Sequence, residues 1–272
     1  MWRFVILCFK ITIMNVTTIE WTDKSWNPVS GCNKVSAGCK FCYAERIALE
    51  GQKEGKGFKN GFEVTLKPWK LNEPMKQAIP KLIFVNSMSD LFHEDIPISY
   101  SKQVFDVMNK NRKHIFQVLT KRSNNLKILD KAGQLNWSDN VWQGVSVENE
   151  DYVHRIDDLR ATGAMVKFLS LEPLIGPLSN LNLEGIDWVI VGGESGPIRR
   201  PIKEKWVWDI KSQCEAAGVP FFFKQWGGEY SKSGGNLLRG KQYLEWPQAY
   251  HDWNNKIKEF LSKKGLLHLW DK

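Results

Sequence analysis

Residues 82–95 read LIFVNSMSDLFHED, and this stretch contains the pattern that decides the fold. Four apolar residues come first, and polar residues follow them from Asn86 onward. A short, continuous apolar run is typical of a strand that is buried on both faces, as the strands of a parallel sheet are. The stretch therefore predicts a buried strand whose carboxyl end carries polar side chains.

The same unit recurs along the chain. Five further apolar runs, each with a polar cluster behind it, read VKFLSL at 166–171, DWVIV at 187–191, VPFFF at 219–223, IFQVL at 115–119 and VWQGVSV at 141–147. Apolar residues at helical spacing predict helices over 99–111, 149–162 and 203–217, and the last places Cys214 toward the core and Gly218 at its C-cap. Strands that alternate with helices predict an α/β fold, a full or partial (β/α) TIM-like barrel.

Polar residues follow all of these runs. In a parallel barrel the carboxyl ends of the strands meet at one face, which is where active sites form. The residues predicted to gather there include Asn86, Ser87, Asp90, Lys121, Arg122, Ser146, Glu148, Ser170, Glu172, Glu194, Lys224 and Gln225. The alternative for each is a local role, in which the side chain caps its own loop.

Three cysteines cluster before the first of these runs. Cys32, Cys39 and Cys42 have the spacing C-x6-C-x2-C in the stretch CNKVSAGCKFC. Three thiolates on one loop can hold three irons of a [4Fe-4S] cluster and leave the fourth iron open to a chelating cofactor. One alternative is zinc, which needs a fourth ligand, and His93 is the nearest downstream histidine. The other is thiols with a redox role or none.

The composition favours an anionic partner. The chain has 272 residues and a net charge of +8, and its last quarter, from Arg199, has 14 Lys or Arg against 8 Asp or Glu. A basic balance suits nucleic acid, although a solvated basic face explains it equally well. The 13 tryptophans can stack on bases, but core packing is the simpler explanation for any one of them.

The chain divides into three parts. Residues 1–13 are expected to be a non-native or disordered extension, because Met14 precedes a polar start. Residues 14–245 are expected to form the barrel, with an exposed, glycine- and lysine-rich insertion at about 51–80, and 246–272 a basic helical tail.

No run approaches the roughly 20 apolar residues that span a bilayer. Free thiols and an oxygen-sensitive cluster suit the cytoplasm.

The cysteine motif resembles that of the radical S-adenosylmethionine (SAM) superfamily, in which an aromatic residue precedes the third cysteine, as Phe41 does here. The usual spacing there is C-x3-C-x2-C, so the first gap is longer in this chain. More closely, the chain resembles a phage-associated family of unknown function with a three-cysteine motif. The stretches that carry this resemblance are WNPVSGCNKVSAGCKFCYAER, FVNSMSDLFHEDIP, FQVLTKR, GVSVEN, SLEPLIGP, DWVIVGGESG and PFFFKQWG.

The resemblance to radical SAM enzymes implies that Cys32, Cys39 and Cys42 ligate a [4Fe-4S] cluster and that SAM chelates its open iron. Reduction of the cluster then cleaves SAM to a 5′-deoxyadenosyl radical, which abstracts a substrate hydrogen. By strand order, the resemblance places the cofactor contacts at Phe41, at Asn86, Ser87 and Asp90 for the amino group, at Ser146 or Glu148 for the ribose, at Ser170 and Glu172, and at Gly192, Gly193 and Glu194 for the adenine.

Substrate contacts are predicted at the same face, at His93, Lys121, Arg122, Lys224 and Gln225. The cations among them can bind a substrate phosphate. Alternatively, they pair with the acidic strand ends Glu148, Glu172 and Glu194. His93 can form an acid/base pair with Asp90, or both can cap the turn that follows the strand.

Together these features predict a radical SAM enzyme for nucleic-acid or nucleotide modification or repair. Its partners are then DNA, RNA or a nucleotide, and an electron donor such as flavodoxin or ferredoxin. Two alternatives stay open. One is a nucleic-acid-binding module with zinc or an iron–sulfur centre and no turnover, and the other is a radical SAM enzyme that acts on a peptide or a small metabolite.

Overall fold

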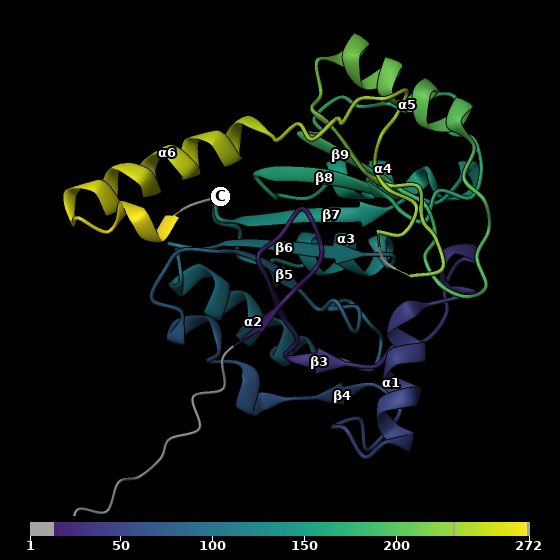
Figure 1. The fold of residues 1–272 in the computed structure, drawn as a ribbon. Coiled ribbons are helices and arrows are strands. Elements are labelled where there is room, and N and C mark those ends of the chain that lie inside the picture. The colour runs from purple at the N-terminus through teal and green to yellow at the C-terminus, as the bar shows by residue number, and fades with distance from the viewer. Residues whose placement is uncertain (1–13, 231, 271–272) are drawn as a thin grey trace, which may run out of the picture.

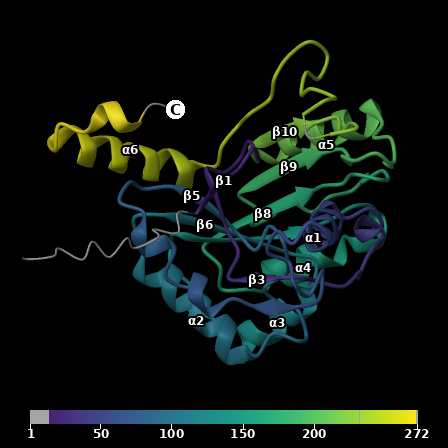
Figure 2. The same cartoon turned by 60° about the horizontal axis from the view of Figure 1, so that its bottom comes forward.

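Seven parallel strands form the centre of the computed structural model, which describes residues 14–230 and 232–270 (Figure 1). In sheet order they are β2 (Lys24–Trp26), β5 (Leu82–Val85), β6 (Ile115–Thr120), β7 (Val141–Ser146), β8 (Val166–Leu171), β9 (Trp188–Gly192) and β10 (Phe221–Gln225). The short strand β1 (Asn15–Val16) runs antiparallel to β2 at one edge. No pairing joins the described residues of β1 and β10, so the sheet curls into half a barrel (Figure 2).

The structure confirms the six predicted strands and the α/β fold, with the partial barrel as the form that is present. All six lie in one sheet and run parallel to their neighbours. The first parallel strand, β2, was not predicted from the sequence. It has 3 residues, two of which are Lys24 and Ser25, so it has no apolar run to mark it.

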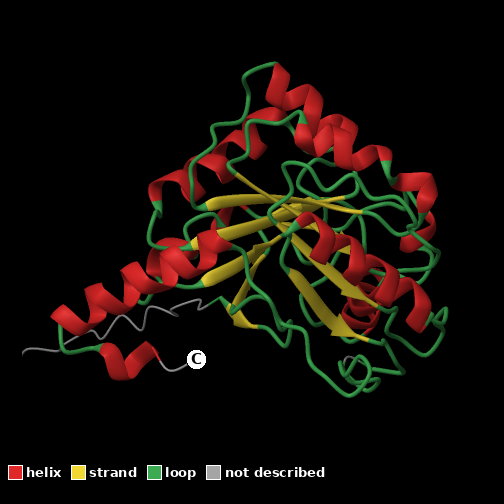
Figure 3. Ribbon diagram, turned by 90° about the horizontal axis from the view of Figure 1, so that it is seen from above, coloured by secondary structure: helices red, strands yellow, loops and turns green. Residues whose placement is uncertain are grey.

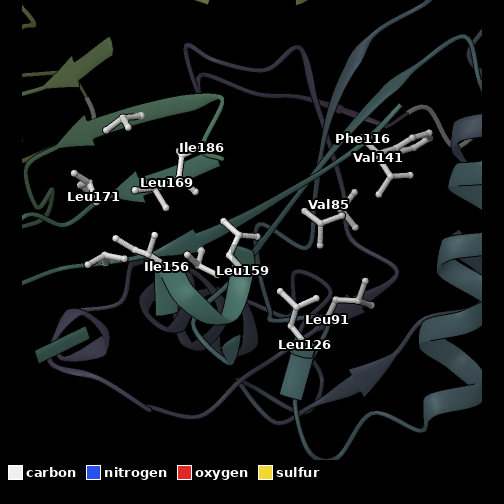
Figure 4. Close-up of a cluster of buried hydrophobic side chains, with 14 of the residues drawn as sticks. Val85, Leu91, Phe116, Leu126, Val141, Ile156, Leu159, Leu169, Leu171 and Ile186 are labelled. Atoms are coloured by element: carbon white, nitrogen blue, oxygen red, sulfur yellow. The ribbon is translucent and has the colours of Figure 1, made fainter. Parts of the chain in front are cut away.

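Helices cover the outer face of the sheet (Figure 3). They are α2 (Ile98–Lys110), α3 (Ser123–Lys131), α4 (His154–Arg160) and α5 (Glu204–Ala217), and three of them fall in the predicted ranges. Between helices and sheet lies one large hydrophobic core, in which Leu126 of α3 and Leu159 of α4 lie near Val85 and Leu169 of the sheet (Figure 4). Helix α5 ends as predicted, with Gly218 in the left-handed region at φ 67° and Cys214 buried.

The inner face of the half-barrel is filled by aromatic side chains. Trp142 and Trp188 are fully buried there, and Trp188 stacks on Trp246 with ring centroids 4.9 Å apart. Helix α6 (Gln248–Lys263) and the 3-10 helix η5 (Leu267–Trp270) add further aromatic residues to this second core. For these tryptophans the core-packing explanation is therefore correct, whereas Trp69 is 70% exposed.

The segment at 51–80, predicted as an exposed insertion, has many exposed residues, but it also contains short regular elements and apolar residues that pack on the core. Its start completes α1 (Tyr43–Lys53), and then come β4 (Thr65–Leu66), paired with β3 (Val29–Ser30), and the 3-10 turns η2 (Pro68–Lys70) and η3 (Pro74–Lys76). Trp26 Nε1 donates to the carbonyl of Lys70 at 2.8 Å, and Pro74 is buried. Apolar residues of the segment pack on the core, so they are removed from water.

Residues 1–13, for which a non-native or disordered extension was predicted, lie outside the described residues. Within the described part of the chain, no helix combines the length and the hydropathy that crossing a membrane requires. Two further 3-10 turns complete the elements, η1 (Ala37–Cys39) in the cysteine loop and η4 (Glu150–Tyr152) before α4.

Candidate functional site

A cavity of about 470 Å³ opens at the carboxyl ends of the parallel strands. The cysteine loop, residues 32–42, lines one side of it, and the ends of the strands line the other. This is the face at which parallel barrels carry their active sites. The predicted residues that line the cavity are Cys32, Cys39, Phe41, Cys42, Asn86, Ser87, Asp90, Lys121, Arg122, Ser146, Ser170, Glu172, Gly193, Glu194, Lys224 and Gln225.

Three half-buried free thiols face this cavity, and among the described residues neither a histidine nor a fourth cysteine lines it. Cys214 is buried in α5 instead. In residues 14–230 and 232–270, no three His, Cys, Asp or Glu side chains converge as ligands of one metal ion. Structural zinc needs such convergence, whereas a cubane spreads its thiolates over separate irons. Three thiols, without a fourth cysteine or a histidine beside them in the described part of the chain, are a donor set that a [4Fe-4S] cluster with one open iron can use.

Cys32 lies against a buried cation. Arg122, directly after β6, donates from Nη1 to Cys32 Sγ at 3.3 Å and from Nη2 to Asn33 Oδ1. Asp90 and Glu94 flank the guanidinium at 3.4 and 2.9 Å. Burial, with a smaller contribution from Asp90, raises the pKa of the Cys32 thiol to about 11, although Arg122 favours the thiolate. A metal that binds here must therefore displace the thiol proton.

Glu148 lies behind the cysteine loop and does not line the cavity. Its side chain is fully buried, and it accepts from Ser36 Oγ at 2.6 Å and from Arg155 Nη1 at 2.9 Å. A Cβ added at Gly38 would lie 2.4 Å from Glu148 Oε1, so the loop passes over this carboxylate only with glycine there. Both carboxylate oxygens thus bind groups of the protein.

Asn86, directly after β5, carries an amide for which residues 14–230 and 232–270 provide no hydrogen-bond partner. The residue is 3% exposed, has φ 60°, and lines the cavity. Asn27 fixes the next two residues, because its Oδ1 accepts from Ser87 Oγ at 3.2 Å and from Met88 N at 3.0 Å. A buried amide without a partner is costly unless a ligand pairs with it. Asn86 is therefore placed to bind a polar group of a ligand.

Two cations predicted to contact a phosphate already have acidic partners. Lys224 Nζ lies 2.6 Å from Glu172 Oε1, and Gln225 Nε2 donates to the same oxygen at 3.4 Å. Lys121 Nζ donates to Ser146 Oγ at 3.1 Å and lies 3.9 Å from a Glu148 oxygen. The alternative of pairing across the mouth of the barrel is therefore correct for both lysines.

His93 and Gly192 do not line the cavity. The His93 ring is buried, its Nδ1 accepts from Asp95 N at 3.1 Å, and burial lowers its pKa. No hydrogen bond joins the described side chains of His93 and Asp90, and Asp90 accepts from Thr120 Oγ1 at 2.7 Å. Both side chains accept from backbone N–H groups of the turn after β5, as the capping alternative predicts.

Three residues that the sequence did not single out also line the cavity. Trp21 and Phe84 are both buried, with ring centroids 4.7 Å apart. The inward side of β5 could have marked Phe84, since alternate strand residues face alternate sides. Trp21 had no such signal, because it precedes a strand that was not predicted. Tyr43 follows Cys42, and its hydroxyl donates to the carbonyl of Ser87 at 2.6 Å.

A second, more open hollow of about 870 Å³ adjoins the cavity. The two share Glu194 and Tyr230, so they form a continuous depression in the surface. Arg199 and Trp226 also line the second hollow, and Tyr230 is 68% exposed. This depression therefore combines a cation with aromatic side chains.

The chain matches one protein family by its sequence and a few solved structures by its fold. No curated protein matches it. Spore photoproduct lyase complexed with dinucleoside spore photoproduct is a solved structure that aligns with a TM-score of 0.45 at 10% identity, covering 92% of this chain and 76% of that chain. A variant of that lyase with bound AdoMet and dinucleoside spore photoproduct aligns with a TM-score of 0.45 at 11% identity, covering 94% of this chain and 77% of that chain. The phage association stays a prediction. The family model "Protein of unknown function (DUF5131)" matches residues 16–247, and the chain therefore belongs to this family.

Proposed function

We propose that the protein is a radical SAM enzyme that modifies or repairs a nucleic acid or a nucleotide. In this proposal Cys32, Cys39 and Cys42 hold a [4Fe-4S] cluster, and SAM binds in the cavity beside them. The cluster and SAM, when bound, supply a 5′-deoxyadenosyl radical that abstracts a hydrogen from the substrate. A flavodoxin or a ferredoxin supplies the electron.

The observation that carries the proposal is the donor set of the cavity. Three thiols line it, and no other soft ligand among the described residues does. A cluster held by three thiolates has an open iron, and the cavity provides the space for a cofactor on that iron. An electron carrier would instead be supplied with a fourth protein ligand.

The walls of the cavity support SAM as the occupant. The unpaired amide of Asn86 offers both a donor and an acceptor to the polar groups of the cofactor. Trp21 and Phe84 form a dry, aromatic side of the cavity, which excludes water from a reactive radical. These features suit a ligand that is polar at one end and aromatic at the other.

The substrate class rests on the adjoining hollow and on the charge. Arg199, Trp226 and Tyr230 line this hollow beside the cavity. A cation with aromatic side chains suits the phosphate and the base of a nucleotide unit. The net charge of +8 favours the same class of substrate.

Anaerobic reconstitution with iron and sulfide tests the cofactor. The protein is expected to turn brown and to release 5′-deoxyadenosine when SAM and a reductant are added. Cys39→Ala is expected to abolish both the colour and the cleavage. Cys214→Ala is the matched control, because it removes a buried thiol outside the cavity and leaves both readouts intact. A colourless wild-type protein loaded with zinc would instead support the binding module without turnover.

The substrate is tested by SAM turnover with DNA, RNA and nucleotides at several salt concentrations. Binding to phosphates is expected to weaken steeply as salt rises. Turnover that a peptide or a small metabolite stimulates, with no salt-sensitive nucleic-acid binding, would contradict this part of the proposal and leave the radical SAM assignment in place.

A further inference from the structure

The cysteine loop has a longer first gap than the usual motif, and residues 33–38 fill it. Arg122 from the end of β6 holds the start of this gap, because its guanidinium donates to both Cys32 Sγ and Asn33 Oδ1. The arginine is 5% exposed and lies between the carboxylates of Asp90 and Glu94. A buried cation between two anions has little freedom to turn away from the loop.

The middle of the gap is held from the end of β7. The carboxylate of Glu148 accepts from Ser36 Oγ at 2.6 Å and is itself bound by Arg155. Tyr152 adds a second bond, because its hydroxyl accepts from the backbone N–H of Ala37 at 2.9 Å. The loop therefore rests on a buried carboxylate whose charge is already compensated.

The end of the gap is held from the segment that follows β9. Arg200 donates from Nη1 to the carbonyl of Ala37 at 2.9 Å and pairs with Glu194 at 2.5 Å. The same guanidinium lies 5.4 Å from the ring centroid of Phe41, next to the third cysteine. Charged residues from the segments that follow β6, β7 and β9 thus contact one short loop.

We propose that Arg122, Glu148 and Arg200 form a clamp that shapes the cysteine loop before any cluster binds. They are positioning residues, and their charges serve the loop rather than SAM or a substrate phosphate. The clamp itself is a property of the metal-free protein. Its use for a cluster rests on the proposed function.

Arg122 has a second role in this proposal, which is to set the reduction potential of the cluster. Hydrogen bonds to cluster sulfurs stabilise the reduced, more negative state. Cys32 receives such a bond from a cation. The Ser36 hydroxyl lies 2.6 Å from Glu148 and 3.6 Å from Cys39 Sγ, and the carboxylate is the stronger acceptor of its one proton. Cys32 is therefore the ligand on which we expect the potential to depend.

Hydrogen exchange on the metal-free protein tests the clamp directly. Glu148→Gln keeps the size of the side chain and removes its charge, so we expect faster exchange at residues 33–39. Asp158→Asn is the matched control, since Asp158 also accepts from a serine hydroxyl at 2.6 Å, but joins α3 to α4. Unchanged exchange in the loop of Glu148→Gln would overturn the clamp.

Redox titration of the reconstituted protein tests the role of Arg122. Arg122→Gln is expected to shift the midpoint potential to more negative values and to speed the loss of iron to a chelator roughly 10-fold, as changes behind metal ligands do. Arg122→Lys, which keeps the charge, is expected to recover part of the potential. A potential that Arg122→Gln leaves unchanged would overturn this role.

The two proposals fail separately. Wild-type protein that takes up no cluster would refute the radical SAM function, and the exchange experiment would still decide the clamp. If the wild-type protein holds a cluster and Glu148→Gln leaves hydrogen exchange in the cysteine loop unchanged, the clamp alone is refuted.

Discussion

At the residue scale, similar polar side chains at the strand ends have different tasks. Glu148 and Glu172 both follow strands of the sheet, β7 and β8, but Glu148 binds the cysteine loop and Glu172 binds Lys224 across the cavity. Asn86 differs from both, because its amide has no hydrogen-bond partner among the residues that the structure describes. Residue type at a strand end is therefore a guide to where a site lies and not to what each residue binds.

Asn86→Ala is expected to weaken SAM binding by about 10-fold, since one hydrogen bond to a charged ligand group contributes about 1.4 kcal/mol at this level. Calorimetry of SAM binding to the reconstituted variant measures this. Asn140→Ala is the control, because the Asn140 amide is fully used by the carbonyls of Met108 and His114, at 3.1 and 3.0 Å. If SAM binding weakened in Asn140→Ala but not in Asn86→Ala, a direct role for Asn86 would be contradicted.

At the element scale, the junction of β9 and β10 depends on a glycine, Gly193, beside which there is no space for a side chain. Gly193 N donates to the carbonyl of Gln225 at 2.9 Å, and a Cβ at Gly193 would lie 2.1 Å from the carbonyl oxygen of Trp226. The close approach of these two backbones brings residues after both strands to the cavity. A glycine at this point is therefore a packing requirement of the sheet.

Gly193→Ala is expected to destabilise the fold by more than about 2 kcal/mol, because backbone cannot move aside as a side-chain end can. Gly218→Ala is the comparison, with open space around its Cβ and a cost of about 1 kcal/mol from its φ of 67°. Denaturant unfolding of both variants gives the difference. Equal losses of unfolding free energy in the two variants would show that the backbone at Trp226 moves away from a side chain at position 193 without cost.

The inner face of the half-barrel sets a second test at this scale. Trp188 is fully buried, and its Nε1 donates to the carbonyl of Glu245 at 2.8 Å. Trp188→Ala is expected to cost about 3–5 kcal/mol, as a large cavity in an aromatic core does. Trp69→Ala, at a side chain that is 70% exposed, is expected to change the unfolding free energy by less than about 0.5 kcal/mol. Thermal or denaturant unfolding compares the two.

At the scale of the whole molecule, segments far apart in sequence are joined by buried polar groups. His114, before β6, accepts from Lys81 N at 3.0 Å through Nδ1, and its Nε2 lies 3.2 Å from the carbonyl of Pro74. The neutral ring with its proton on Nε2 satisfies both neighbours. Burial lowers the pKa of His114 to about 4, because the charged ring is disfavoured there.

Stability is therefore expected to depend on pH through His114. The unfolded chain takes up the proton near the ordinary value of 6.5, and the folded chain does so only near 4. The neutral His114 ring therefore contributes roughly 3 kcal/mol to the free energy of unfolding above pH 6.5, and this contribution is lost as the pH is lowered toward 4. Unfolding free energies measured from pH 7 to 4 test this, and His114→Asn is expected to have the shallower slope. If the unfolding free energies of the wild type and of His114→Asn had equal slopes against pH, this role of His114 would be contradicted.

The sequence by itself determined six of the seven parallel strands, and it predicted that their polar carboxyl ends and the three thiols lie at one face, where the cavity is. Apolar runs of six strands are local signals, because a doubly buried strand needs them at every position. The cysteine spacing is local in the same way. Neither requires knowledge of which segments meet in space.

Only the tertiary structure decided which partner each charged residue takes. For Arg122, Glu148 and His93 the sequence leaves open whether each binds a ligand or a group of the protein. In the structure all three are buried and bonded to segments of the chain, two of them to the cysteine loop. Pairing depends on distances of a few ångströms between residues far apart in the chain, and no periodicity records these. The short strand β2 and the contribution of Trp21 to the cavity were hidden for the same reason.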